Sequence, residues 1–164
     1  MLTPPFALLA ALVLSPGDSL PPWVAVDAAA QTVTLTLEVT QPAGAASAVI
    51  NGEHDGSVQV VVPRGWTVQW RWKNADQAPH SLVVMVEREK LPMEGGRPSF
   101  TNAMSRSVTA GLPGGGTDNT TFTADEAGWY WVLCGVPGHA IAGEWIGLKV
   151  DPAATGVSVK RKGG

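Results

Sequence analysis

The stretch GWYWVLCGVPGHAIAGEW, residues 128–145, combines two kinds of sequence that together point to the fold. Its first half is a run of aromatic and aliphatic residues, which is typical of a buried β-strand. Its second half is rich in Gly and Pro, which let the backbone turn tightly. Cys134, His139 and Glu144 follow one another along this second half, at the end of the strand and along the loop. The stretch therefore predicts a strand followed by a loop that can direct three polar side chains toward one point.

Segments on either side of this stretch also have strand character. TVTLTLEVT, residues 32–40, alternates apolar and polar side chains with a period of two, which predicts a half-buried strand. Further strands are predicted over residues 57–63, 66–73, 80–87, 119–124, 128–134 and 144–150. Their number and spacing favour an all-β domain of about seven to eight strands, folded as a sandwich or a barrel. The long segment from residue 90 to residue 116 reads as a loop that covers one flank of the domain.

Three tryptophans share one face of the strand predicted over residues 66–73. Trp66, Trp70 and Trp72 alternate with polar residues. Such a stripe can be a stacking platform for bases or sugars, or it can be part of the hydrophobic core. We interpret it as core.

The two ends of the chain read differently from its middle. The apolar run FALLAALVL, residues 6–14, is too short to span a bilayer and resembles a secretory signal, although no Lys or Arg precedes it. We therefore predict a signal peptide or disordered segment over residues 1–30, a single folded domain over 31–151, and a basic tail over 152–164. The predicted location is extracytoplasmic (periplasmic, secreted or cell-surface), with membrane association only through the N-terminal segment.

The composition narrows the classes of function. The chain has 164 residues, 45% of them hydrophobic and 15% charged, which is the composition of one globular domain. The net charge of −3 gives no electrostatic reason to expect a nucleic-acid partner. The single cysteine excludes an intramolecular disulfide and leaves an inert thiol, a nucleophile or a metal ligand.

The chain has only three histidines, so the search for further ligands is short. His80 begins a predicted strand directly after Ala-Pro, whereas His54 lies in a polar turn, NGEHDG, and reads as solvated. One thiolate with two imidazoles is the donor set of a mononuclear blue-copper site, completed by a weaker axial ligand. Zinc also accepts Cys and His, but structural zinc sites more often use several thiolates. A cysteine hydrolase needs a third orienting residue, and none is evident.

The chain resembles the cupredoxins, most closely the sulfocyanin-like proteins. The resemblance covers NGEHDGSVQVVVPRGWTVQWRWKN, PHSLVV and TFTADEAGWYWVLCGVPGHAIAGEWI, and AGWYWVLCGVPGHAIAGEW is its most specific part. It implies a Greek-key β-sandwich that binds one copper ion and transfers single electrons outside the cytoplasm. His80 matches the first histidine ligand of the family, Cys134 its thiolate and His139 its second histidine. The implied partners are other redox proteins, such as those of a respiratory chain, and we expect a monomer.

The sequence departs from the family at Glu144. Family members usually carry methionine at this step, and the more distant stellacyanins carry glutamine. We predict Glu144 as the axial ligand, a carboxylate that favours Cu(II) over Cu(I) and lowers the reduction potential. The alternatives are a three-coordinate copper or an axial carbonyl near Pro79. Of the methionines, Met85 should face away from His80.

One residue beside the ligands is predicted to support them. Ser81 is placed to hydrogen-bond toward the cysteine loop, a support that metal ligands usually have. Two functions then compete: an electron carrier that cycles between Cu(II) and Cu(I), and a copper-delivery or copper-storage module. An enzyme is not expected, because a second metal site would need further histidines.

Overall fold

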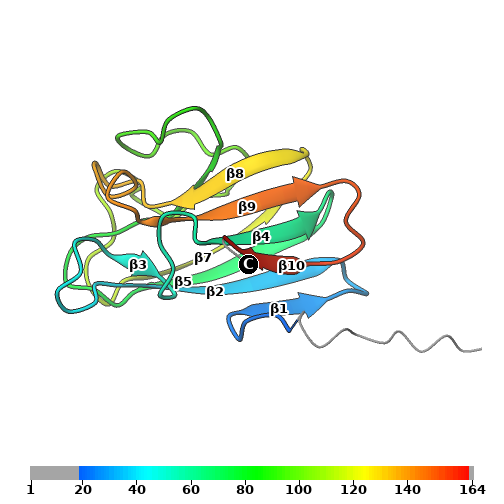
Figure 1. Ribbon diagram of the computed structural model, residues 1–164, viewed down its shortest axis with the longest axis horizontal. Coiled ribbons are helices and arrows are strands. Elements are labelled where there is room, and N and C mark those ends of the chain that lie inside the picture. The colour runs from blue at the N-terminus through cyan, green and yellow to red at the C-terminus, as the bar shows by residue number, and fades with distance from the viewer. Residues whose placement is uncertain (1–18, 163–164) are drawn as a thin grey trace, which may run out of the picture.

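A computed structural model describes residues 19–162 of the protein. Its regular secondary structure over that range consists of β-strands alone. The strands form two five-stranded sheets, one above the other in Figure 1. The predicted all-β Greek-key sandwich is confirmed, with ten strands in place of seven to eight. In residues 19–162 no helix has the length and apolar character needed to cross a membrane.

The first sheet has the spatial order β1-β2-β5-β7, and β3 pairs with the end of β2. Strands β2 and β5 run parallel to each other, and the other pairs in this sheet are antiparallel. Its strands are β1 (Val24–Asp27), β2 (Thr32–Thr40), β3 (Val49–Ile50), β5 (Thr67–Asn74) and β7 (Thr117–Thr123).

The second sheet has the spatial order β10-β4-β9-β8-β6. Strands β4 and β9 are parallel, and the remaining pairs are antiparallel. Its strands are β4 (Val58–Pro63), β6 (Val83–Val86), β8 (Gly128–Leu133), β9 (Trp145–Asp151) and β10 (Ser158–Arg161).

Alternating side chains of both sheets make up the main core. The apolar side chains of β2 are each at most 1% exposed, whereas Glu38 on the same strand faces solvent. Trp70 and Trp72 on β5 are each 1% exposed and Trp66 is 7% exposed, so the interpretation of the tryptophan stripe as core is confirmed. Burial of each Val or Leu side chain contributes roughly 1.5–3 kcal/mol, which makes this core the rigid base on which the loops are held.

The folded part extends beyond the predicted range of residues 31–151 at both ends. Strand β1 pairs with β2, with Val24 opposite Leu35, and β10 pairs with β4, with Ser158 opposite Val61. The sequence of β10 resembles a basic tail because β10 is an edge strand, where charged side chains are tolerated. Such charges also keep other chains from pairing with the exposed edge. The predicted apolar run at residues 6–14 lies outside the described residues.

One predicted strand begins later than the sequence suggests. Strand β6 starts at Val83, three residues after His80, which instead forms an isolated bridge with Leu112. The preceding Pro79 has no N–H to donate, and the chain reaches the sheet only after this bridge. The detour matters because it directs His80 to the end of the sandwich.

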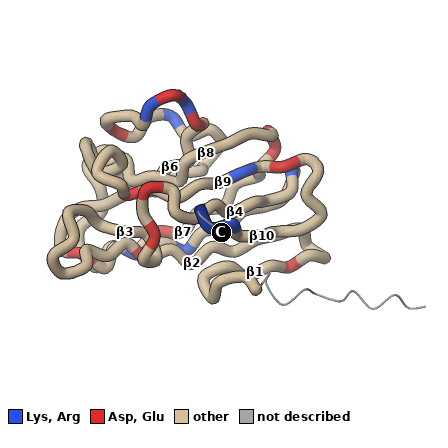
Figure 2. The backbone as a smooth tube through the Cα atoms, viewed as in Figure 1, with Lys and Arg blue, Asp and Glu red and all other residues tan. Residues whose placement is uncertain are grey.

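The long segment between β6 and β7 covers the outer face of the second sheet, as the sequence predicts. Leu91 and Val108 from this segment pack against a small buried cluster that contains Val83, Trp131 and Leu133. Part of the segment is the green loop at the top of Figure 1. Figure 2 shows that this loop carries both acidic and basic residues, so it does not form a patch of a single charge sign.

Candidate metal centre

Three of the four predicted ligands lie on one β-hairpin. Strands β8 and β9 pair with Leu133 opposite Trp145, so Cys134 and Glu144 are the next residues, at the end of the hairpin where the loop connects the strands. The Cys134 N–H donates a hydrogen bond to the Glu144 carbonyl at 3.1 Å, which closes the loop of residues 135–143. The Glu144 N–H in turn donates to the His139 carbonyl at 3.1 Å, so the middle of the loop folds back over its ends.

Two glycines of this loop serve different needs. Gly138 has a φ of 84°, in the left-handed region, but no atom lies within 4 Å of where its Cβ would be. Gly135 is packed tightly: a Cβ there would lie 2.4 Å from Cγ1 of Val108 and 2.9 Å from the Val108 carbonyl oxygen. The first glycine permits the turn, and the second permits the long loop to approach the hairpin.

His80 comes from a distant part of the sequence. Strand β6 pairs antiparallel with β8, with Val83 opposite Leu133, so the residues before β6 lie beside those after β8. Two backbone hydrogen bonds hold His80 in place: its N–H donates to the Leu112 carbonyl at 3.1 Å, and its carbonyl accepts from the Leu112 N–H at 2.7 Å. The imidazole is thereby placed against the hairpin that carries the other three side chains.

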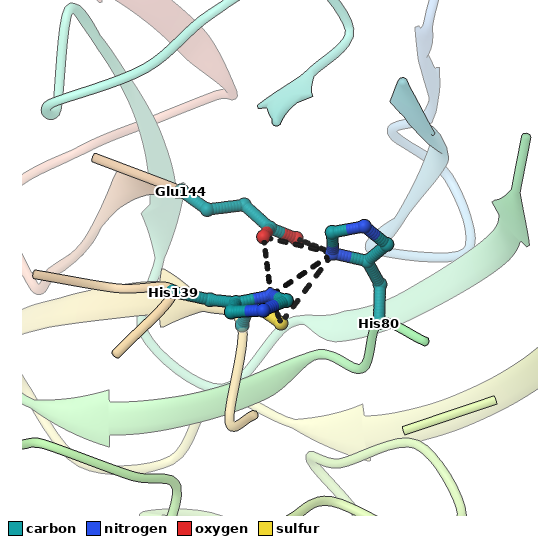
Figure 3. Close-up of side chains that lie close together, drawn as sticks. His80, His139 and Glu144 are labelled. Atoms are coloured by element: carbon teal, nitrogen blue, oxygen red, sulfur yellow. Dashed lines mark hydrogen bonds and ion pairs between the residues drawn. The ribbon is translucent and has the colours of Figure 1, made fainter. Parts of the chain in front are cut away.

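The four side chains converge, with one ligand atom from each lying within 4.8 Å of the others (Figure 3). The Nδ1 atoms of His80 and His139 are 3.2 Å apart, and Sγ of Cys134 lies 3.5 Å from the His139 nitrogen and 3.9 Å from the His80 nitrogen. The Glu144 carboxylate approaches from the other side, at 2.9 Å from Nδ1 of His80 and 3.1 Å from Nδ1 of His139. Glu144 therefore points into the cluster, as the axial-ligand prediction requires.

Burial differs among the four side chains. Cys134, Glu144 and His80 are between 0% and 2% exposed, whereas the His139 side chain is 29% exposed. The cluster is thus largely shielded from bulk water, and His139 is its most exposed member.

The pKa values of both imidazoles are raised. Burial disfavours the charged form of His80, but its bonds to Cys134, Glu144 and Asp76 outweigh this and raise its pKa to about 10. The pKa of His139 rises to about 9, chiefly through its contact with Cys134 and then through Glu144.

The pKa values of the two acids move the other way. Burial alone would raise the pKa of Glu144, yet the bonds from His139 and His80 hold it below its ordinary value. The same two imidazoles outweigh burial at Cys134 and lower the pKa of its thiol. In the protein alone, protons on the imidazoles therefore balance the negative charge of the thiolate and the carboxylate.

Ser81 connects the segment of His80 to the hairpin, as predicted from its position. Its backbone N–H points to Sγ of Cys134 at 3.4 Å. Its hydroxyl donates to the Val108 carbonyl at 2.5 Å and accepts from the Gly135 N–H at 2.9 Å. One serine thus holds three chain segments together around the thiol.

Sequence reasoning missed Asp76. Its Oδ2 lies 2.9 Å from Nε2 of His80, on the side of the ring opposite to Glu144. The only signal in the sequence is a carboxylate four residues before the histidine, in a polar turn where a solvated aspartate is the ordinary interpretation.

Other candidate residues lie outside the cluster. His54 is exposed and pairs with Asp55 at 3.0 Å, in agreement with its interpretation as a solvated residue. Sδ of Met85 is 3.4 Å from the Gly96 N–H, so this methionine faces away from His80 as expected. Met93 and Met104 are 63% and 43% exposed.

A pocket of about 150 Å³ reaches the cluster beside the segment that joins β2 and β3. His80, His139 and Glu144 form its inner wall. Much of the rest is lined by small side chains, namely Ala46, Ser47, Ala48, Ala78 and Ala142. A small solute can approach the donors from this side.

The donor atoms fit a metal ion. The two imidazole Nδ1 atoms lie 3.2 Å apart, and a sulfur and a carboxylate point to the same place. A cation at this place satisfies all four donors at once. One thiolate, two imidazoles and a further weak ligand are the set that suits copper, while zinc accepts the same atom types.

A β-sandwich that holds such a donor set at one end belongs to the cupredoxin class, which confirms the resemblance noted in the sequence. The model of the sulfocyanin (SoxE) domain family matches residues 22–158, and the chain belongs to this family.

Individual relatives are more distant. Sulfocyanin from Sulfolobus acidocaldarius is 28% identical over 125 residues, which cover 72% of this chain and 63% of the relative's length. Copper nitrite reductase from Nitrosomonas europaea has a similar fold, with a TM-score of 0.55 and 24% identity over 74% of this chain and 42% of that one. Dithionite-reduced auracyanin from Roseiflexus castenholzii gives a TM-score of 0.48 and 24% identity, over 71% of this chain and 97% of that one.

Proposed function

We propose that this protein is a mononuclear type 1 copper protein that carries single electrons, with His80, Cys134, His139 and Glu144 as ligands. The observation that carries the proposal is the convergence of these four side chains within 4.8 Å, at one end of the sandwich. Copper bound there would supply a one-electron change between Cu(II) and Cu(I).

The role of the chain itself is to hold the ligands still. Cys134 and Glu144 are fixed by the last backbone hydrogen bond of a hairpin, and His80 by its bridge to Leu112. Both attachments rest on a close-packed core, which resists rearrangement. Ligands held in this way keep nearly the same positions in both oxidation states, so little energy is spent on reorganisation.

Glu144 distinguishes this site from the family pattern. Its carboxylate is 1% exposed and carries a negative charge that water does not screen. Because Cu(II) carries one more positive charge than Cu(I), an axial carboxylate stabilises the oxidised form more. We propose that the reduction potential is low compared with that of a methionine-ligated site.

The proposed role is electron transfer and not catalysis. His54, the remaining histidine, is exposed and bonded to Asp55, so it does not join the cluster. The nitrite reductase with a similar fold is more than twice as long as the matched region, and the whole activity named in its title is not transferred to this chain.

The proposed partners are redox proteins outside the cytoplasm, such as those of a respiratory chain. Support comes from the exposed edge of His139 and from Ile141 beside it, which is 52% exposed. The loop of residues 135–143 contains no Lys, Arg, Asp or Glu, as its tan colour in Figure 2 also shows. An uncharged apolar surface of this kind suits brief contact with another protein. Ala140, in the same loop, is buried and does not contribute to this surface.

A copper-delivery or copper-storage role is the second candidate. The pocket that reaches His80, His139 and Glu144 favours it, because a competing ligand can approach the metal through it. Slow release of copper to a chelator, together with a reversible potential, supports the carrier; fast release supports delivery.

The deciding experiment is a visible absorption titration of the full chain with Cu(II). An intense thiolate-to-copper band that saturates at one equivalent supports the proposal. Cys134→Ser should abolish this band, and His54→Gln, which changes a histidine outside the cluster, should leave it unchanged. Copper binding without an intense band would contradict the proposal, and a chain that prefers zinc would do the same.

A further inference from the structure

His80 is held between two carboxylates. Its Nδ1 faces Glu144 at 2.9 Å, and its Nε2 faces Oδ2 of Asp76 at 2.9 Å. An imidazole that binds a metal through Nδ1 carries its proton on Nε2, and that N–H needs an acceptor. Oδ2 of Asp76 is placed to be this acceptor, and its side chain is only 15% exposed.

Asp76 is itself fixed by a small frame of hydrogen bonds. Its backbone N–H donates to Oδ1 of Asn74 at 2.9 Å. The buried Asn74 amide donates to the carbonyls of Ala78 at 2.7 Å and Leu112 at 2.9 Å. Leu112 is also the backbone partner of His80, so the carboxylate and the imidazole share one frame.

The second histidine has a different environment. The polar contacts of the His139 ring within the described residues are made by Nδ1, with Cys134, His80 and Glu144. Its ring is the exposed one, at 29%. Of these two histidines, and within residues 19–162, the buried His80 alone has a carboxylate on the far side of its ring.

We propose that Asp76 is a positioning residue that fixes the orientation and the Nε2–H tautomer of His80 and stabilises the oxidised metal through that ring. The proposal rests on the proposed copper site. A carboxylate acceptor makes the imidazole a stronger donor, and it adds negative charge near the metal. Both effects favour Cu(II) over Cu(I).

The test compares Asp76→Asn and Asp76→Ser with Asp125→Asn. Asp125 is exposed in the turn between β7 and β8, at the end of β8 that lies away from Cys134. Its substitution by asparagine removes one negative charge, as Asp76→Asn does, but far from the cluster. The full-length proteins are loaded with copper, and the Cu(II) and Cu(I) affinities and the midpoint potential are measured. We expect the Asp76 variants to bind Cu(II) about 10- to 100-fold more weakly. Each tenfold loss that is specific to Cu(II) raises the potential by about 59 mV.

The outcomes separate the two proposals. If the wild-type protein shows no intense thiolate-to-copper band, the copper-carrier proposal fails. If the band is present but Asp76→Asn matches Asp125→Asn in both potential and Cu(II) affinity, the role of Asp76 is refuted. Thermal unfolding of the metal-free variants checks their fold, and either Asp76 variant that folds decides the question.

Discussion

Cys134 and Glu144 face each other at the loop end of the β8–β9 hairpin, where the Cys134 N–H donates to the Glu144 carbonyl at 3.1 Å. The thiol and the carboxylate thus belong to two residues whose backbones are hydrogen-bonded to each other. A change in one ligand leaves the attachment of the other intact, so substitutions at Glu144 should report on chemistry more than on folding.

Replacement of Glu144 by methionine should raise the midpoint potential of the copper site. The substitution removes a buried negative charge that favours Cu(II) and restores a neutral thioether. Voltammetry of the copper-loaded variant measures the effect, with Glu144→Gln as the isosteric neutral control, which should also raise the potential. A potential for Glu144→Met that equals or lies below the wild-type value contradicts an axial role for Glu144.

Removal of the Ser81 hydroxyl should destabilise the protein and change the copper spectrum. Ser81→Ala leaves the Val108 carbonyl and the Gly135 N–H without their present partner, at a cost of about 1–3 kcal/mol for each buried group. Urea unfolding gives the loss of stability. Thr109→Ala, in an exposed position of the same long loop, should unfold like the wild type. Equal stability of the two variants would mean that water replaces the hydroxyl.

Two glycine substitutions in the ligand loop should have unequal effects. Gly138→Ala places a side chain in open space at a φ of 84°, so its cost is the backbone strain of about 1–2 kcal/mol. Gly135→Ala pushes a methyl group against Cγ1 and the carbonyl oxygen of Val108, next to Cys134. It should cost more stability and shift the thiolate-to-copper band, which Gly138→Ala should not. Unfolding and absorption measured on both variants test this order, and an inverted order would mean that the long loop is free to move.

The metal-free protein should lose stability as the pH rises from neutral. His80 and His139 have folded pKa values of about 10 and about 9, against 6.5 ordinarily, so their contribution is complete below pH 6.5 and is lost through pH 9–10. The lowered pKa of the Cys134 thiol acts in the opposite direction and offsets part of this loss. Glu144, with its pKa below 4.5, contributes stability that is lost as the pH falls into the acid range.

Urea unfolding of the metal-free protein across pH 4–10 measures this dependence. The double variant His80→Gln, His139→Gln should show a flatter alkaline side than His54→Gln, whose histidine is exposed. A wild-type profile as flat as that of the double variant would show that the imidazoles are not charged in the folded protein.

A chain restricted to residues 31–151 should be less stable than the full chain. It lacks β1 and β10, and with β10 it loses Val157 and Val159, which pack against the core. Because these two side chains are partly buried, we expect the free energy of unfolding to fall by about 2 kcal/mol or more. Denaturant unfolding of both chains gives the difference, and equal stability would show that the edge strands do not contribute.

The positions of the four candidate ligands can be predicted from the sequence because they lie in patterned surroundings. Cys134 ends an apolar run, and Glu144 begins the next one, so their place at a hairpin end follows from the strand pattern. The tryptophan stripe and the alternation over residues 32–40 place the core in the same way. A strand with one buried face alternates apolar and polar side chains, and this period of two can be recognised in the sequence.

Other features leave no such pattern. Strand β10 has a basic, partly exposed sequence, because an edge strand is paired through its backbone on one side only. The contact of Asp76 with His80 depends on how one polar turn folds, and no periodicity encodes it. The late start of β6 likewise follows from the bridge between His80 and Leu112, which lie far apart in the sequence.

That same separation sets the order in which the parts of the site can assemble during folding. Three ligands lie on one hairpin and need only a short loop to close, whereas His80 must be brought 54 residues to reach Cys134. Closing the longer loop costs more chain entropy and belongs to the late, non-local contacts. In a sample that refolds with copper, the thiolate-to-copper band of the proposed four-ligand site would therefore develop with the closing of the second sheet and not with the hairpin.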